Sequence, residues 1–125
     1  MSCTYMNKKT LVIGASLNTE KYSNIAIRLL QKKSHEALAV GVKPGHILET
    51  HVETEMIDHK EIHTVSLYLS PKHQPAYYQY VISLNPQRVI FNPGTENQGF
   101  EELLRENNIF YESACTLVLL NTDQY

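Results

Sequence analysis

The hydrophobic pattern of the chain alternates between short apolar runs and longer stretches in which apolar residues recur every three or four positions. Short runs of this kind are typical of strands buried on both faces of a parallel sheet, and the longer period is that of an amphipathic helix. The apolar runs predict strands over 10–14, 36–45, 63–70, 88–94 and 115–120. The helical period predicts helices over 23–33, 71–84 and 100–108.

This order of elements predicts the fold class. Strands that alternate with helices and are joined by right-handed crossovers form a three-layer, Rossmann-like α/β fold, here a doubly wound sheet of about five parallel strands. A chain of 125 residues is long enough for one such domain over 1–125. Residues 1–8 lack an apolar pattern, and we expect them to be a poorly ordered N-terminal extension.

Two segments leave alternatives open. Residues 46–62 have no helical period and are interpreted either as a short extended piece around 52–55 or as a long loop. In the helix over 71–84, Ser70 is the expected N-cap and Pro71 stands at the first helical position, where its missing amide is harmless. Pro75 fits only if the regular helix begins after it.

Composition and charge exclude several classes of protein. A net charge of −2 and a pI near 6.3 argue against a nucleic-acid partner, which requires a basic surface. No apolar run approaches the roughly 20 residues of a membrane-spanning helix, so no membrane attachment is expected. The two cysteines, Cys3 and Cys115, are interpreted as reduced thiols of a cytoplasmic protein, with Cys115 as a small buried hydrophobe.

In a doubly wound sheet the ligand lies beyond the carboxyl ends of the strands, so the residues after each strand are the candidate site. Gly14 ends the first strand and precedes a helix whose free amides and dipole favour an anion. A phosphate group is the expected guest. The other strand ends bring Lys43 and Pro44, Ser70 and Pro71, and Asn92, Pro93, Gly94 and Thr95.

The residues of two turns restrict the choice of cofactor. A dinucleotide-binding loop would carry further glycines two and five residues after Gly14, where this chain has Ser16 and Thr19. After the second strand, Lys43 occupies the place where NAD-binding proteins present an acidic residue to the ribose. A cation there favours a ribose with an extra phosphate, as in NADP or coenzyme A, unless Lys43 is simply a solvated turn residue.

The segments "VIGASLNTEKYSNIAIRLL", "TVSLYLSP", "RVIFNPGTEN" and "ESACTLVLLNTDQY" resemble the small stand-alone coenzyme A-binding proteins, which are similar to the N-terminal domain of the succinyl-CoA synthetase α subunit. The resemblance implies that the first loop holds the phosphates, that Lys43 contacts the coenzyme, and that the turn after the fourth strand closes over it. Lys43 here precedes Pro44-Gly45, whereas the synthetase lysine follows its Pro-Gly pair. These roles pass by resemblance to Gly14, Ala15, Ser16, Lys43, Asn92, Pro93 and Gly94. With the other residues of the loop and the strand ends, the predicted cofactor-binding residues also include Asn18, Tyr22, Ser23, Pro44, Ser70 and Pro71.

These observations predict a coenzyme A or acyl-CoA binding module without catalytic activity, with a small NADP-binding oxidoreductase as the alternative. Ser16 stands in an incomplete nucleophile-elbow motif, because Asn18 occupies the position where the motif has its final glycine. His59 and His63 are four residues apart but are interpreted as solvated loop residues, so no metal is expected. Tyr77, Tyr78 and Tyr80 crowd one predicted helix and are interpreted as core residues with polar tips, unless they form a dimer face or stack on the adenine. A homo-oligomer or a protein partner therefore stays open.

Overall fold

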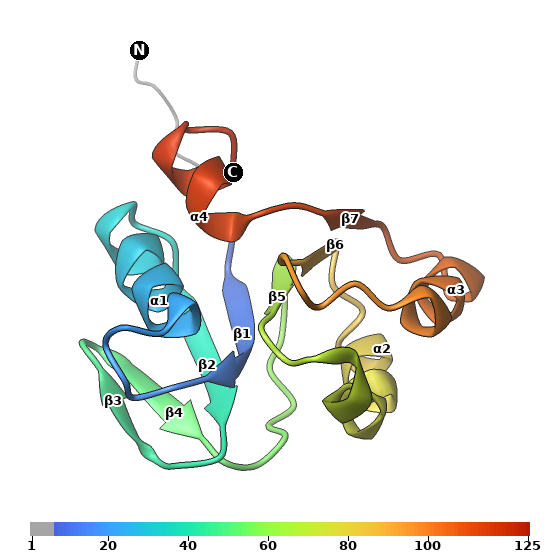
Figure 1. The fold of residues 1–125 in the computed structure, drawn as a ribbon, viewed down its shortest axis with the longest axis horizontal. Coiled ribbons are helices and arrows are strands. Elements are labelled where there is room, and N and C mark those ends of the chain that lie inside the picture. Colours follow the sequence, from blue (N-terminus) through green and yellow to red (C-terminus); the bar gives the residue numbers. More distant parts are fainter. Residues whose placement is uncertain (1–6) are drawn as a thin grey trace.

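The computed structural model describes residues 7–125, which form a seven-stranded sheet in the order β3-β4-β2-β1-β5-β6-β7. The strands are β1 (Thr10–Ala15), β2 (Ala37–Gly41), β3 (Gly45–Ile47), β4 (Thr50–Glu53), β5 (Thr64–Leu67), β6 (Arg88–Phe91) and β7 (Tyr111–Ser113). All neighbouring strands pair in parallel except β3, which pairs antiparallel to β4. The predicted doubly wound α/β fold is therefore confirmed, with more strands than expected (Figure 1).

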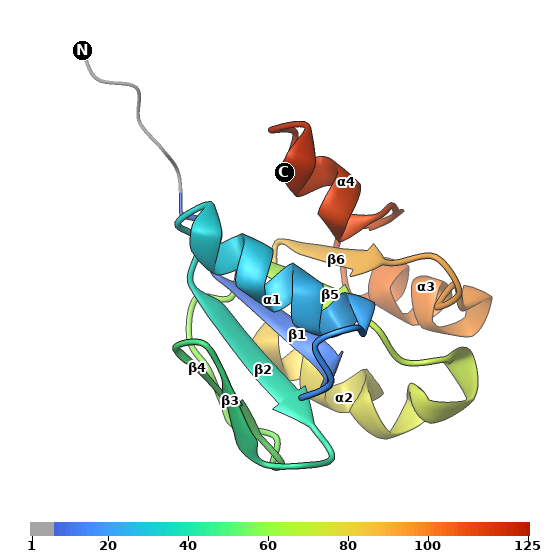
Figure 2. The ribbon, with the colours of Figure 1, turned by 60° about the vertical axis from the view of Figure 1, so that its left-hand side comes forward.

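Helices cover both faces of the sheet. On one face lie α1 (Tyr22–Lys32) and α4 (Thr116–Asn121), and on the other lie α2 (Tyr78–Leu84) and α3 (Gln98–Glu106) (Figures 1 and 2). Successive residues of β1 point to opposite faces, so Val12 packs with the first pair of helices and Leu11 with the second. Both are fully buried, which explains the apolar run that predicted this strand.

The prediction of a strand over 115–120 is wrong, because these residues form helix α4. The amide of Leu119 donates to the Cys115 carbonyl, as in a helix, and the Thr116 amide donates to the Asn92 side chain. A short apolar run does not by itself distinguish a buried strand from a short buried helix. The strand beside β6 is instead β7, a partly exposed edge strand, and Cys115 is half-buried, not fully buried as expected.

Strand pairing shows which alternative holds for residues 46–62, and the position of Pro75 shows where the helix in 71–84 begins. Within 46–62, an extended piece lies at Thr50–Glu53, where β4 pairs with β2 and forms a hairpin with β3. Residues 71–77 form two single turns of 3-10 helix, at Pro71–His73 and Pro75–Tyr77, before α2 begins. The regular helix thus begins after Pro75. Ser70 makes no side-chain capping bond.

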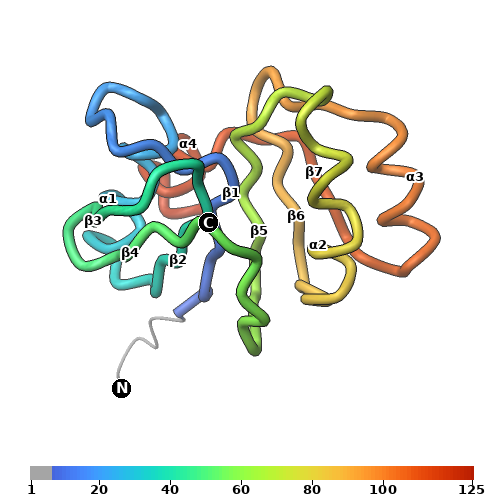
Figure 3. The backbone as a smooth tube through the Cα atoms, turned by 90° about the horizontal axis from the view of Figure 1, so that it is seen from below, coloured from blue at the N-terminus to red at the C-terminus, as the bar shows by residue number. Residues whose placement is uncertain are grey.

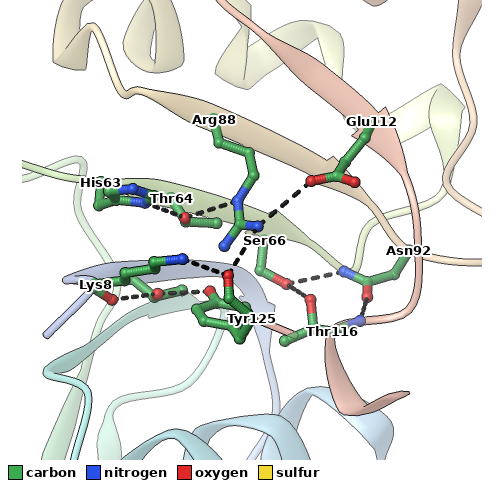
Figure 4. A network of polar contacts seen from close by, with 10 residues as sticks. Lys8, His63, Thr64, Ser66, Arg88, Asn92, Glu112, Thr116 and Tyr125 are labelled. Atoms are coloured by element: carbon green, nitrogen blue, oxygen red, sulfur yellow. Dashed lines mark hydrogen bonds and ion pairs between the residues drawn. The ribbon is translucent and has the colours of Figure 1, made fainter. Parts of the chain in front are cut away.

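A polar network ties the end of the chain to the amino ends of the strands (Figure 4). The Arg88 guanidinium, at the start of β6, donates to the Thr64 hydroxyl at 3.1 Å and to the Glu112 carboxylate and a main-chain oxygen of Tyr125, both at 3.4 Å. The same Tyr125 oxygen accepts a bond from the Lys8 ammonium. The expected disordered extension over 1–8 falls mainly on residues 1–6, outside the described residues, whereas Lys8 is held by these contacts.

The lowered pKa values of two histidines near this network predict how the stability of the protein depends on pH. Burial, together with the positive charges of Lys8 and Arg88, lowers the pKa of His35, whose Nδ1 accepts the Lys8 amide at 2.9 Å. Burial and the same cations lower the pKa of His63. Because the unfolded chain takes up these protons near pH 6.5 and the folded chain resists them, stability is full above that pH and is lost on acidification.

We therefore expect the melting temperature to fall between pH 7.5 and pH 5.5, as measured by calorimetry in matched buffers. The control is His35→Asn, which offers an oxygen to the Lys8 amide but does not titrate in this range. This variant should lose less stability than the wild type over the same interval. An equal loss in both proteins would show that His35 does not contribute to the acid sensitivity.

Candidate functional site

The polarity of the sheet places a cavity at the point where strand order reverses. β1 lies between β2 and β5, so the chain leaves β1 toward one side and later returns on the other (Figure 3). A cavity of about 390 Å³ lies at the carboxyl ends of β1, β5 and β6, where doubly wound folds bind their ligands. We call it the switch-point cavity. It is lined by Gly14, Ser16, Lys21, Tyr22, Ser23, Tyr68, Ser70, Pro93, Gly94 and Thr95.

A second cavity, which we call the apolar cavity, adjoins the first. It has a volume of about 310 Å³ and is lined by Tyr22, Tyr68, Asn92, Pro93, Cys115 and Leu117. Three of these residues line both cavities, so the two lie side by side along the strand ends. A cavity of about 480 Å³ near Gln31, His35 and Glu36 is larger, but it borders the end of α1 and the start of β2, away from the carboxyl ends of β1, β5 and β6.

The loop between β1 and α1 is held by its own hydrogen bonds. The Ser16 hydroxyl accepts the Asn18 amide at 3.1 Å, and the Ser16 carbonyl accepts the Asn24 side-chain amide at 2.9 Å. Arg28, one turn further along α1, donates to the Thr19 carbonyl and to the Asn24 side chain, both at 2.8 Å. Ser16 and Asn18 therefore shape the loop before any ligand arrives, and binding does not have to order it.

The start of α1 is suited to an anion. The helix begins at Tyr22 with no side-chain cap and no acidic residue in its first turn, which leaves its first amides without protein side-chain partners. Lys21, Tyr22 and Ser23 all line the switch-point cavity, and among residues 7–125 Lys21 is the one charged residue in its lining. Free amides, the helix dipole and an ammonium group thus favour a negatively charged group at the same place.

Gly14 is a glycine for a reason within the fold. Its φ is +95°, and a Cβ at this position would lie 2.9 Å from the carbonyl carbon of Tyr68. The main chain just after β5 therefore lies so close to Gly14 that the fold itself requires a glycine here. The close approach of a ligand to the Gly14 backbone stays a prediction. Gly94 also has a positive φ, +91°, but a Cβ there meets nothing within 4 Å.

These two glycines form a matched pair for a stability test. Gly94→Ala should cost only the backbone strain of a positive φ, about 1–2 kcal/mol. Gly14→Ala adds the overlap with Tyr68, about 1–3 kcal/mol more. Denaturant unfolding of both variants measures the difference. Equal losses would mean that the main chain around Tyr68 yields to the added methyl group.

Most of the residues implied by the sequence meet at these cavities. The structure brings Gly14, Ser16, Tyr22, Ser23, Ser70, Pro93 and Gly94 to the switch-point cavity and Asn92 to the apolar cavity. It does not bring Ala15, Asn18, Lys43, Pro44 or Pro71 to either lining. Lys43 and Pro44 are exposed in the turn after β2, which abuts the first loop because Gly45 packs against the Leu17 side chain.

Asn92 is buried, and its side chain is engaged within the protein. Its amide nitrogen donates to the Ser66 hydroxyl and the Leu67 carbonyl, both at 2.9 Å, and its oxygen accepts the Thr116 amide at 2.9 Å (Figure 4). These bonds join β5, β6 and the start of α4. Asn92 therefore positions the turn that carries Pro93 and Gly94.

Sequence reasoning missed Lys21, Tyr68 and Leu117, and it did not place Cys115 in a cavity, whereas Thr95 was predicted with its strand end. Tyr68 was within reach of the strand-end rule, because it directly follows β5. Leu117 was hidden by the wrong strand over 115–120. His59 and His63 are half-buried, not solvated as expected. Residues 7–125 contain no group of three or more His, Cys, Asp or Glu side chains that could hold a metal ion.

Comparison with known proteins identifies the family. The model of the CoA binding domain matches residues 8–121 of this chain. The chain belongs to the CoA binding domain family.

No helix within residues 7–125 is long and apolar enough to cross a membrane. None of the curated proteins matches the sequence.

Solved structures agree with this CoA-binding-domain fold. A crystal structure of an uncharacterized protein is 42% identical, with a TM-score of 0.93 over 96% of this chain and 99% of the other. Cell-free ID.343 from Thermus thermophilus is 19% identical, with a TM-score of 0.82 over 94% of this chain and 91% of that one. A hypothetical protein from Pyrococcus horikoshii OT3 is 22% identical, with a TM-score of 0.84 over 93% and 83% of the two chains. The last two show similarity of fold alone.

Proposed function

We propose that this protein binds coenzyme A or an acyl-CoA across the two adjoining cavities. The observation that carries the proposal is the uncapped start of α1, which faces the switch-point cavity together with Lys21 in a chain of the CoA binding domain family. The first amides of α1, the Ser23 hydroxyl and the Lys21 ammonium hold the pyrophosphate. Lys43, in the turn that abuts the first loop, pairs with the 3′-phosphate.

The protein acts as a binding module in the cytoplasm and performs no chemistry on the coenzyme. Support comes from Ser16, whose hydroxyl accepts a main-chain amide of its own loop, and from the two linings, which hold neither histidine nor carboxylate within the described residues. A nucleophilic serine requires a base within hydrogen-bond reach. The half-buried free thiol of Cys115 suits a reducing compartment.

The test is calorimetric titration with coenzyme A, NAD and NADPH, together with mass spectrometry of ligand retained by the gently purified protein. Coenzyme A should bind and raise the melting temperature, by an amount equivalent to about 2.7 kcal/mol at a hundredfold excess over the dissociation constant. Binding of NADPH without binding of coenzyme A would overturn the proposal in favour of an oxidoreductase. Steady cleavage of acetyl-CoA that disappears in Ser16→Ala would overturn the non-catalytic role.

A further inference from the structure

The apolar cavity differs from the switch-point cavity in chemistry. Tyr22 and Tyr68 contribute aromatic rings, and Pro93, Cys115 and Leu117 contribute a ring, a thiol and a branched alkyl group. Within the part of the chain that the structure describes, no charged residue lines the apolar cavity, whereas Lys21 lines the switch-point cavity. The phosphates of a bound coenzyme belong beside Lys21, so the apolar cavity faces the other, uncharged end of the molecule.

One polar atom interrupts this apolar lining. The Tyr68 hydroxyl oxygen is buried and has no hydrogen-bond partner among residues 7–125. The hydroxyls of Ser66 and Thr116, which bond to each other at 2.8 Å, are its polar neighbours, and their proximity partly offsets the effect of burial on the pKa of Tyr68. Burial raises the pKa of Tyr68 well above its ordinary value, so the group remains a hydrogen-bond donor throughout the physiological range. A buried donor without a partner is costly, and a ligand oxygen would satisfy it.

We propose that the apolar cavity holds the acyl group of a short-chain acyl-CoA, with the thioester carbonyl oxygen accepting a hydrogen bond from Tyr68. This inference rests on the proposed function, because it presumes that the coenzyme's phosphates lie in the switch-point cavity. The two cavities share Tyr22, Tyr68 and Pro93, so one extended molecule reaches from the first into the second.

The volume of the cavity sets the size of the acyl group. If each non-hydrogen atom needs about 30 Å³, the volume of a water molecule in the liquid, the apolar cavity of about 310 Å³ holds about ten such atoms. The end of the pantetheine arm and the thioester take about half of them. About four or five acyl carbons remain, which corresponds to butyryl and similar groups and excludes long chains.

The first experiment titrates coenzyme A, acetyl-CoA, butyryl-CoA and decanoyl-CoA into the wild-type protein. Each methylene group buried in the cavity should tighten binding by up to roughly fourfold, so butyryl-CoA should bind about tenfold more tightly than acetyl-CoA. Decanoyl-CoA should gain nothing further. Equal affinities for coenzyme A, acetyl-CoA and butyryl-CoA would overturn the inference while leaving coenzyme binding intact.

Cavity variants test the location. Leu117→Phe reduces the space and should abolish the preference for butyryl-CoA over coenzyme A, whereas Leu117→Ala enlarges it and should move the preference toward longer chains. The matched control is Val118→Phe on the same helix, because Val118 is 55% exposed and lines neither cavity. A preference that does not change in either Leu117 variant would place the acyl group elsewhere.

Tyr68→Phe tests the hydrogen bond. Coenzyme A lacks the thioester carbonyl, so this variant should weaken butyryl-CoA by about threefold to tenfold more than it weakens coenzyme A. The melting temperature of the free protein should be equal or higher, since a buried unpartnered hydroxyl is removed. Equal losses for both ligands would overturn the assigned bond. Failure of the wild type to bind coenzyme A at all would instead overturn the proposed function, which the first titration reveals separately.

Discussion

Ser70→Trp is expected to weaken coenzyme A binding by about 30- to 100-fold, the cost of overpacking a site that the ligand must fill. Ser70 lines the switch-point cavity, is exposed, and has a side chain that makes no capping bond. A tryptophan there occupies the ligand's space without removing an interaction of the fold. Calorimetric titration measures the loss, and the melting temperature of the free protein should stay the same.

The matched control is Lys72→Trp, two residues further along in the same 3-10 turn. Lys72 is exposed and lines neither cavity, so this variant carries the same bulky side chain on the same segment. It should bind coenzyme A like the wild type. Undiminished binding in Ser70→Trp would show that the coenzyme lies outside the switch-point cavity.

The second large effect concerns the two lysines assigned to phosphates. Lys21→Ala should weaken coenzyme A and dephospho-coenzyme A equally, by about ten- to a hundredfold, because a charge-assisted bond to the shared pyrophosphate is lost. Lys43→Ala should weaken coenzyme A by about tenfold and leave dephospho-coenzyme A unaffected, since its exposed ammonium meets only the 3′-phosphate. Titration of both ligands into both variants separates the two roles.

Lys32→Ala serves as the control for net charge. Lys32 ends α1, far along the helix from the start that faces the cavity, and it is exposed. This variant should bind both ligands like the wild type. If Lys43→Ala weakens both ligands equally, Lys43 shapes the loop or holds the pyrophosphate, and if it weakens neither, Lys43 is a solvated turn residue.

The strands of the interior could be predicted from sequence, because they are apolar on both faces. In β1, Leu11 and Val12 are both fully buried, on opposite sides of the sheet, so every position in the run is apolar. Edge strands carry no such signal. β7 is partly exposed, and it was missed while the apolar run of α4 was mistaken for it. Short buried helices and strands share a composition, and only their neighbours in space distinguish them.

The candidate site divides in the same way. The turns after β1, β5 and β6 could be predicted from the sequence, because a doubly wound fold places its ligand at strand ends. The role of each turn residue depends on contacts that form only in the folded protein. Gly14 avoids a clash with Tyr68, and the Asn92 side chain forms hydrogen bonds within the protein. Such roles depend on atoms from segments that are distant in the sequence, and the local pattern of residues carries no information about them.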